Sequence, residues 1–136
     1  MRFKTKTTWE RAFYMSPVIL LVMADMAIYC EENVLPFLIT ETFTTEAEDR
    51  KVNRQHSCHR EGRAFDVSIR GWSPVEMKKF EEFFEKKWGH LGAISPVSGN
   101  KNLVELHKGT ALHFHVQIAK TYAVKANFQE ALYDKD

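Results

Sequence analysis

The sequence predicts a single α+β domain, residues 1–136, in which a small antiparallel sheet carries helices on one of its faces. Its 136 residues suit one compact domain with one hydrophobic core. Helical and strand-like periodicities both occur, in separate segments. No repeat and no linker divides the chain, and the formal net charge of +1 provides no concentrated basic face for nucleic acid. The short basic start, residues 2–6, is expected to be a solvated end.

Two helices are expected to cover the sheet. Ser16 as N-cap and Pro17 at the first helical position predict a mostly apolar helix from about Pro17 to Glu32. Ser73 and Glu76 form a capping-box pattern before a second helix, which ends near Gly89 and Gly92. Its buried side is expected to carry residues at helical spacing: Met77, Phe80, Phe84 and Trp88. A weaker helix candidate covers residues 122–133.

Four segments have the composition of strands. Residues 35–40 are short and apolar, and residues 64–69 alternate between apolar and polar. Residues 103–107 and 112–118 flank a turn signal and predict an antiparallel hairpin. Residues 41–58 are polar and are expected to be irregular.

The apolar run at residues 16–30 is too short to span a bilayer, and Asp25 interrupts it. The chain start lacks the pattern of a signal peptide. We therefore expect a protein with no stable membrane association that is made and left in the cytoplasm unless something else releases it. We also expect it to be a monomer. Cys30 and Cys58 are expected to be reduced thiols rather than a disulfide.

Five of the six histidines fall in two segments, and such a cluster favours metal binding. Side chains of a strand alternate between faces, so the odd-numbered Glu105, His107, His113 and His115 should share one surface of the hairpin. A turn centred on Gly109 predicts that Glu105 lies opposite His113, His107 opposite Ala111 and Leu103 opposite His115. The even-numbered residues should pack on the helices: Val104, Leu106, Leu112, Phe114 and Val116.

The stretch SCHREGRAFDVS places His59, Gly62, Ala64 and Asp66 on an HxxGxAxD frame. Asp66 lies between two apolar strand residues, so its side chain should face away from the core. A carboxylate among apolar strand residues is energetically costly unless a positive charge pairs with it. A divalent metal ion would provide that charge. Two imidazoles and one carboxylate with an open fourth position are typical of a catalytic zinc site. The alternative is a metal-free, hydrogen-bonded polar patch.

The order SxHxxGxAxD, at Ser57 to Asp66, followed by His113-Phe114-His115, resembles the signature of zinc D-alanyl-D-alanine carboxypeptidases. That family includes phage L-alanyl-D-glutamate endopeptidases, and the zinc-binding domain of hedgehog proteins shares its fold. The resemblance covers residues 16–118. It implies one zinc ion on the far face of the sheet from the helices, held by His59, Asp66 and His115. It also implies a peptidoglycan stem peptide as substrate, and hence action on the cell wall or in the periplasm if the protein is released.

The chain departs from the family pattern where many members carry their general base. Three positions before the last zinc histidine this chain has Leu112 instead of an acid. The hedgehog-like branch carries a glutamate on the preceding strand, across from the first histidine of HxH. By the predicted pairing Glu105 has that place, so Glu105 is expected to be the base, with His113 as the next candidate and a possible oxyanion partner.

The family's upstream arginine, which holds a substrate carboxylate, has no counterpart at residues 43–45. Arg50, Arg54 or Arg63 could replace it. Arg63 and His107 are taken as the substrate-binding candidates. The acidic residues 41–49 lie where hedgehog proteins have a calcium loop, but a solvated loop is the favoured interpretation.

The resemblance implies a zinc metallopeptidase that hydrolyses a bond of the stem peptide, as an endolysin-like endopeptidase or a D,D-carboxypeptidase. The alternative is a non-catalytic zinc-containing binding module of the hedgehog-like type. The missing acid at Leu112 and the missing arginine favour the module, while Glu105 and His113 favour the enzyme.

Overall fold

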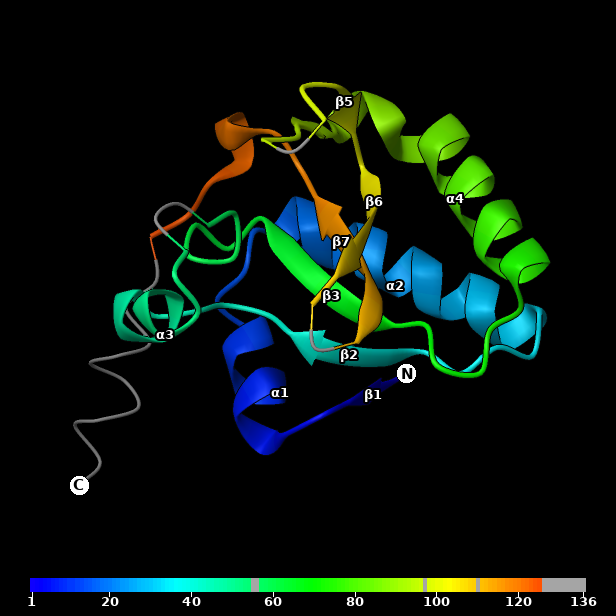
Figure 1. Cartoon of the computed structure of the whole chain (residues 1–136), viewed down its shortest axis with the longest axis horizontal. Coiled ribbons are helices and arrows are strands. Elements are labelled where there is room, and N and C mark those ends of the chain that lie inside the picture. Colours follow the sequence, from blue (N-terminus) through cyan, green and yellow to red (C-terminus); the bar gives the residue numbers. More distant parts are fainter. Residues whose placement is uncertain (55–56, 97, 110, 126–136) are drawn as a thin grey trace.

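The structure, a computed structural model, describes residues 1–54, 57–96, 98–109 and 111–125. Its centre is a five-stranded sheet with the strand order β1-β2-β3-β7-β6 (Figure 1). The strands are β1 (Arg2–Phe3), β2 (Leu38–Glu41), β3 (Ala64–Ser68), β6 (Val104–Lys108) and β7 (Leu112–Gln117). The pairs β2–β3, β3–β7 and β6–β7 are antiparallel, but β1 is parallel to β2. The α+β class is therefore confirmed, with a mixed rather than a wholly antiparallel sheet.

In the described ranges four α-helices accompany the sheet: α1 (Lys6–Ala12), α2 (Pro17–Glu32), α3 (Glu46–Lys51) and α4 (Pro74–Trp88). Both predicted helices begin where their caps indicate, and the Ser73–Glu76 capping box is formed. Two 3₁₀ turns, η1 (Gly89–Leu91) and η2 (Lys120–Tyr122), and a two-stranded sheet of β4 (Ala93–Ile94) and β5 (Lys101–Asn102) complete the described elements. Among the described residues no helix is long and apolar enough to cross a membrane.

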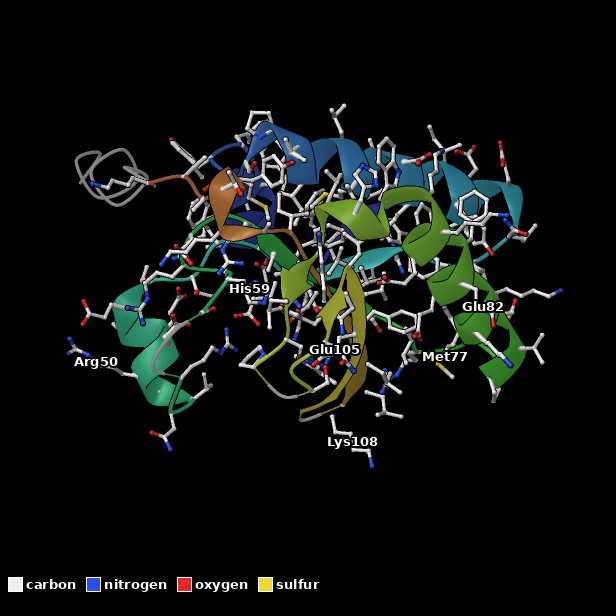
Figure 2. All side chains as sticks on the ribbon, turned by 90° about the horizontal axis from the view of Figure 1, so that it is seen from above. Arg50, His59, Met77, Glu82, Glu105 and Lys108 are labelled. Atoms are coloured by element: carbon white, nitrogen blue, oxygen red, sulfur yellow. The ribbon has the colours of Figure 1, made fainter. Side chains whose placement is uncertain are left out.

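The core lies between the sheet and the helices α2 and α4. Ile19 and Met26 of α2 and Phe80 of α4 are fully buried there. Phe80 stacks on Phe114 of β7, with ring centroids 5.5 Å apart. Figure 2 shows α2 along one side of the sheet, with the labelled His59 and Glu105 on the side away from it. One face of the sheet is thereby left for polar side chains.

The elements β1, α1 and α3 are among those that the sequence did not predict. The basic start is not a solvated end, because Arg2 N donates to the Phe37 carbonyl and residues 2–3 become an edge strand. Helix α1 follows directly, with Thr5 as its N-cap. The acidic residues 41–49 are not a solvated loop either, since Thr45 caps α3 and Asp49 is fully buried.

Asp49 owes its burial to two arginines. Arg60 Nε donates to Asp49 Oδ2 at 2.9 Å, and Arg54 Nη1 donates to Asp49 Oδ1 at 3.4 Å. A buried carboxylate requires such paired charge. This acidic side chain is therefore bound to the protein's own arginines.

The hairpin has the predicted strands but a different register. Glu105 lies opposite His115, His107 opposite His113, and Lys108 opposite Leu112. The predicted partners, His113 for Glu105, Ala111 for His107 and His115 for Leu103, are wrong. Lys108 pairs with Leu112, so the hairpin is centred one residue beyond Gly109. Moving the turn centre by one residue moves each partner by two, which preserves the face on which every side chain lies.

The apolar face of the hairpin is only partly buried. Val104, Phe114 and Val116 belong to the core, as predicted, but Leu106 and Leu112 are each 47% exposed. Leu106 borders a shallow groove beside α4, together with Met77 and Pro74. Both leucines lie nearer to the turn than the buried Val104 and Val116.

The remaining predictions concern the cysteines and the chain end. Cys30 is buried in the core and Cys58 is half-buried, and both are free thiols. Within the final predicted helix, η2 ends at Tyr122 and residues 123–125 are not helical. The rest of that prediction, residues 126–133, lies outside the described residues.

Gly62 is predicted to be essential to the loop that precedes β3. Its φ of +66° is in the left-handed region, and an added Cβ would lie 2.5 Å from Phe43 Cζ and 2.6 Å from Val124 Cγ2. We expect Gly62→Ala to lower the free energy of unfolding by ~2–4 kcal/mol, through backbone strain and overpacking together. Urea denaturation measures this change.

Gly71→Ala is the matched control. Gly71 has a φ of +86° but no neighbour within 4 Å of a built Cβ, so only the backbone cost of ~1 kcal/mol applies. Equal losses in the two variants would show that the packing under Gly62 is unimportant.

Candidate metal centre

Three side chains converge on the polar face of the sheet: His59, Asp66 and His115. Asp66 of β3 and His115 of β7 are cross-strand partners, and His59 comes from the loop before β3. Asp66 Oδ1 lies 3.1 Å from His59 Nε2 and 3.0 Å from His115 Nδ1. One donor atom from each residue lies within 4.8 Å of the other two, and all three residues are buried. This group could hold a metal ion.

The loop at residues 57–63 fixes His59 by successive turns. Ser57 Oγ accepts a hydrogen bond from His59 N at 3.1 Å, which accounts for the serine of the motif. His59 Nδ1 donates to the Thr42 carbonyl at 2.8 Å. Since a carbonyl oxygen can only accept, Nδ1 carries a proton and Nε2 is the nitrogen turned toward Asp66. Orientation of the ring by a backbone carbonyl is typical of metal-binding histidines.

His115 is oriented in the same way through its other nitrogen. His115 Nε2 donates to Gln117 Oε1 at 3.2 Å, so Nδ1 is the nitrogen turned toward Asp66. Ala64, whose side chain is fully buried, lies opposite Gln117 in the β3–β7 pair. A small residue at that position leaves room for the buried Gln117 side chain, which accounts for the alanine of the motif.

The electrostatics of the group favour cations. Burial by itself lowers the pKa of His59, but the charge of Asp66 and its hydrogen bond outweigh this and raise the pKa to about 9. The pKa of His115 is also raised, because the Asp66 contact outweighs burial. Burial opposes ionisation of Asp66, yet the two histidines hold its pKa well below the usual range. In the metal-free protein, protons therefore fill the positions that a divalent ion would take.

The other odd-numbered residues of the hairpin surround this group. Glu105 lies opposite His115, and its Oε1 accepts a hydrogen bond from His107 Nε2 at 2.8 Å. The His107 ring stacks on that of His115, with centroids 4.7 Å apart and planes 6° apart. His113 Nε2 lies 3.5 Å from Asp66 Oδ2 at the half-exposed rim. The structure thus brings all four odd-numbered residues to one site.

Arg63, the predicted substrate-binding arginine, is engaged elsewhere. Its Nε and Nη2 donate to Glu61 Oε1, and Nη1 donates to the Ile118 carbonyl. Arg54 is the arginine near the centre. Its guanidinium donates to Glu41 Oε1 at 3.0 Å. Burial by itself lowers the pKa of Arg54, but the hydrogen bond to Glu41 and the charges of Glu41, Asp49 and Asp66 outweigh it and raise the pKa.

Glu41 reaches the site because β2 is irregular there. The register between β2 and β3 shifts between Ile39 and Glu41, so that Glu41 lies opposite Asp66. Such bulges redirect side chains, often beside functional sites. Carboxylates therefore flank the centre on both sides, Glu41 on β2 and Glu105 on β6.

Sequence reasoning missed three contributors to the site, Glu41, Thr42 and Gln117, and it left Arg54 as one of three candidate arginines. A signal existed for Gln117, which continues the odd-numbered face of His113 and His115 as a polar residue between two apolar ones. No comparable signal marked Thr42 and Glu41, because a backbone carbonyl and a bulge leave no pattern in sequence spacing.

Comparisons with family models, with curated proteins and with solved structures find no match for this chain.

Metal binding should depend on the three converging residues. We expect the wild type to carry about one zinc ion per chain, and His115→Ala and Asp66→Asn to lose zinc affinity by more than the ~10–100-fold typical of an outer-shell partner. Elemental analysis and competition with a chromophoric chelator measure this. His90→Ala, at an exposed histidine of η1, is the control and should bind as wild type. Equal zinc content in all variants would exclude the centre.

The metal-free protein should lose stability as the pH rises. The raised pKa of His59 stabilises the fold fully below the unfolded-state value of 6.5, and this contribution is lost as the pH rises through about 9. The loss is on the order of 3 kcal/mol. Urea unfolding in chelator between pH 6 and 10 measures it. Excess zinc should abolish the decline, because metal ligation requires neutral imidazole. A flat profile in chelator would contradict the assigned charge on His59.

Proposed function

We propose that the chain is a zinc metallopeptidase that hydrolyses a peptide bond in the peptidoglycan stem peptide, as an endolysin-like endopeptidase or a D,D-carboxypeptidase. The observation that carries the proposal is the convergence of two motifs. The HxxGxAxD frame supplies His59 and Asp66, the HxH segment supplies His115, and their donor atoms lie within 4.8 Å of one another. The resemblance of these motifs to the carboxypeptidase family supports the substrate class.

The donor set fits zinc. Two imidazoles and one carboxylate match the nitrogen and oxygen ligands that zinc takes in catalytic sites, whereas structural sites are closed by four ligands and are often rich in cysteine. In the described part of the chain, no fourth His, Cys, Asp or Glu joins the group. Three protein ligands leave a position for water and substrate.

Zinc, when bound at this site, lowers the pKa of water and polarises a carbonyl group. Glu105 is the proposed general base. Burial would raise the pKa of Glu105, but hydrogen bonds from Ser95, Asn102 and His107 outweigh it and lower the pKa. The carboxylate is therefore ionised at neutral pH. It accepts a proton from the attacking water and delivers it to the leaving amine nitrogen.

The two rim histidines have separate roles in the proposal. His113 is half-exposed and lies beside Asp66, where its imidazole can donate to the oxygen of the scissile carbonyl. His107 holds Glu105 by a hydrogen bond and covers His115 by stacking. Arg54, with about one-third of its side chain exposed, is better placed than Arg63 to bind a substrate carboxylate.

Glu105→Gln tests the base. The amide keeps the shape of the side chain but cannot take a proton, so we expect hydrolysis of purified peptidoglycan to fall by ~10²–10⁴-fold. Zinc content should be unchanged, since Glu105 is not one of the three ligands. Mass spectrometry of released fragments measures the rate and identifies the bond that is cut. Digestion at the wild-type rate would show that another group is the base.

The alternative, a non-catalytic zinc-containing module, is supported by Leu112, an exposed leucine where many family members carry their acid. A zymogram on cell walls separates the two functions. Clearing that a chelator abolishes supports the peptidase, and bound zinc without clearing supports the module.

A further inference from the structure

We propose that Gln117 and Asn102 form an amide relay that fixes the tautomer of metal ligand His115 and positions Glu105. The metal half of this proposal concerns ligand geometry alone, and the half that involves Glu105 rests on the proposed function. Gln117 and Asn102 are positioning residues, because Gln117 acts through His115 and Asn102 acts through Glu105.

Gln117 is 1% exposed and has one possible orientation of its amide. Its Nε2 donates to Asn102 Oδ1 at 3.0 Å and to the Ala93 carbonyl at 3.5 Å. Both of these partners are acceptors, so the NH₂ group must face them. Oε1 consequently faces the other way, where it accepts from His115 Nε2 at 3.2 Å and from Cys58 Sγ at 3.7 Å.

Asn102 extends this chain of hydrogen bonds in the same direction. Its Oδ1 is occupied by the Gln117 donor, so its Nδ2 is the atom turned toward Glu105, where it donates to Oε2 at 2.9 Å. Glu105 Oε1 accepts in turn from His107 Nε2. The hydrogen bonds therefore run in one direction. His115 donates to Gln117, Gln117 donates to Asn102, and Asn102 donates to Glu105.

Reversing either amide would be costly. A flipped Gln117 would direct its NH₂ group at the protonated His115 Nε2 and its oxygen at the Asn102 oxygen. A flipped Asn102 would direct an oxygen at the Glu105 carboxylate. Each reversal leaves buried polar atoms without partners, at a cost of ~1–3 kcal/mol per group. The ring of His115 is thus held with Nε2 protonated and with the lone pair of Nδ1 directed at the metal position.

The metal half is tested by zinc titration and NMR, which need no substrate. In the zinc-loaded wild type, long-range ¹H–¹⁵N spectra should show His115 protonated at Nε2 and coordinated through Nδ1. Gln117→Leu removes the acceptor, and we expect a ~10–100-fold loss of zinc affinity and exchange broadening of the His115 Nε2 proton. Wild-type affinity with an unchanged His115 spectrum would overturn the relay.

Gln117→Glu separates the two halves and serves if Gln117→Leu does not fold. A carboxylate still accepts from His115 but cannot donate to Asn102, so zinc affinity should stay within about threefold of wild type. Turnover should fall, because Asn102 then turns its donor away from Glu105. A loss of zinc affinity as large as that of Gln117→Leu would overturn the assigned direction.

Asn102→Ala, with Asn100→Ala as an exposed control, tests the catalytic half. We expect unchanged zinc affinity, a lower kcat and an acid limb of the pH profile that moves to higher pH, because Glu105 loses a donor. An unchanged kcat and pH profile would overturn this half. If the wild type binds zinc but cleaves nothing, the proposed peptidase and the catalytic half fail together, while the Gln117 variants still decide the metal half.

Discussion

The polar site depends on how the carboxylate of Asp66 is kept ionised inside the protein. Asp66 sits at the middle of the sheet, away from bulk water, and a buried charge of this kind is unfavourable without a partner. His59 and His115 supply the partners, each held by a second contact that leaves one ring nitrogen turned inward. Removing either histidine would leave the buried carboxylate with only one of these two close partners.

The pairing of the strands brings the side chains of the site together around Asp66. Because β3 and β7 pair in register, Asp66 meets His115 across one pair of strands while Phe65 and Phe114 enter the core on the opposite face. The apolar packing of α2 and α4 therefore restrains the polar face without touching it. The neighbouring strands add the flanking carboxylates, Glu41 through a bulge in β2 and Glu105 through its place opposite His115.

Local chemistry made much of this predictable. The caps at Ser16 and Ser73 marked the two long helices, and the alternation of β3 and β7 predicted the correct face for Asp66 and His115. The hairpin register was not predictable, because parity is the same for turn centres that differ by one residue. Helix α3 was not predicted, although Thr45 and Glu48 form its capping box, because its six residues are too few for a periodic pattern. Arg54 could not be chosen over Arg63 because only tertiary pairing distinguishes them.

The spacing of the converging residues along the chain has a thermodynamic consequence. Asp66 and His115 are 49 residues apart, and all of α4 lies between them. A metal ion that joins them closes a long loop, as a disulfide does, and so restricts the unfolded chain if the ion stays bound there. Both cysteines are free thiols, so no covalent cross-link has this effect. In this protein the ion would be a reversible cross-link, which a chelator breaks by removing the metal.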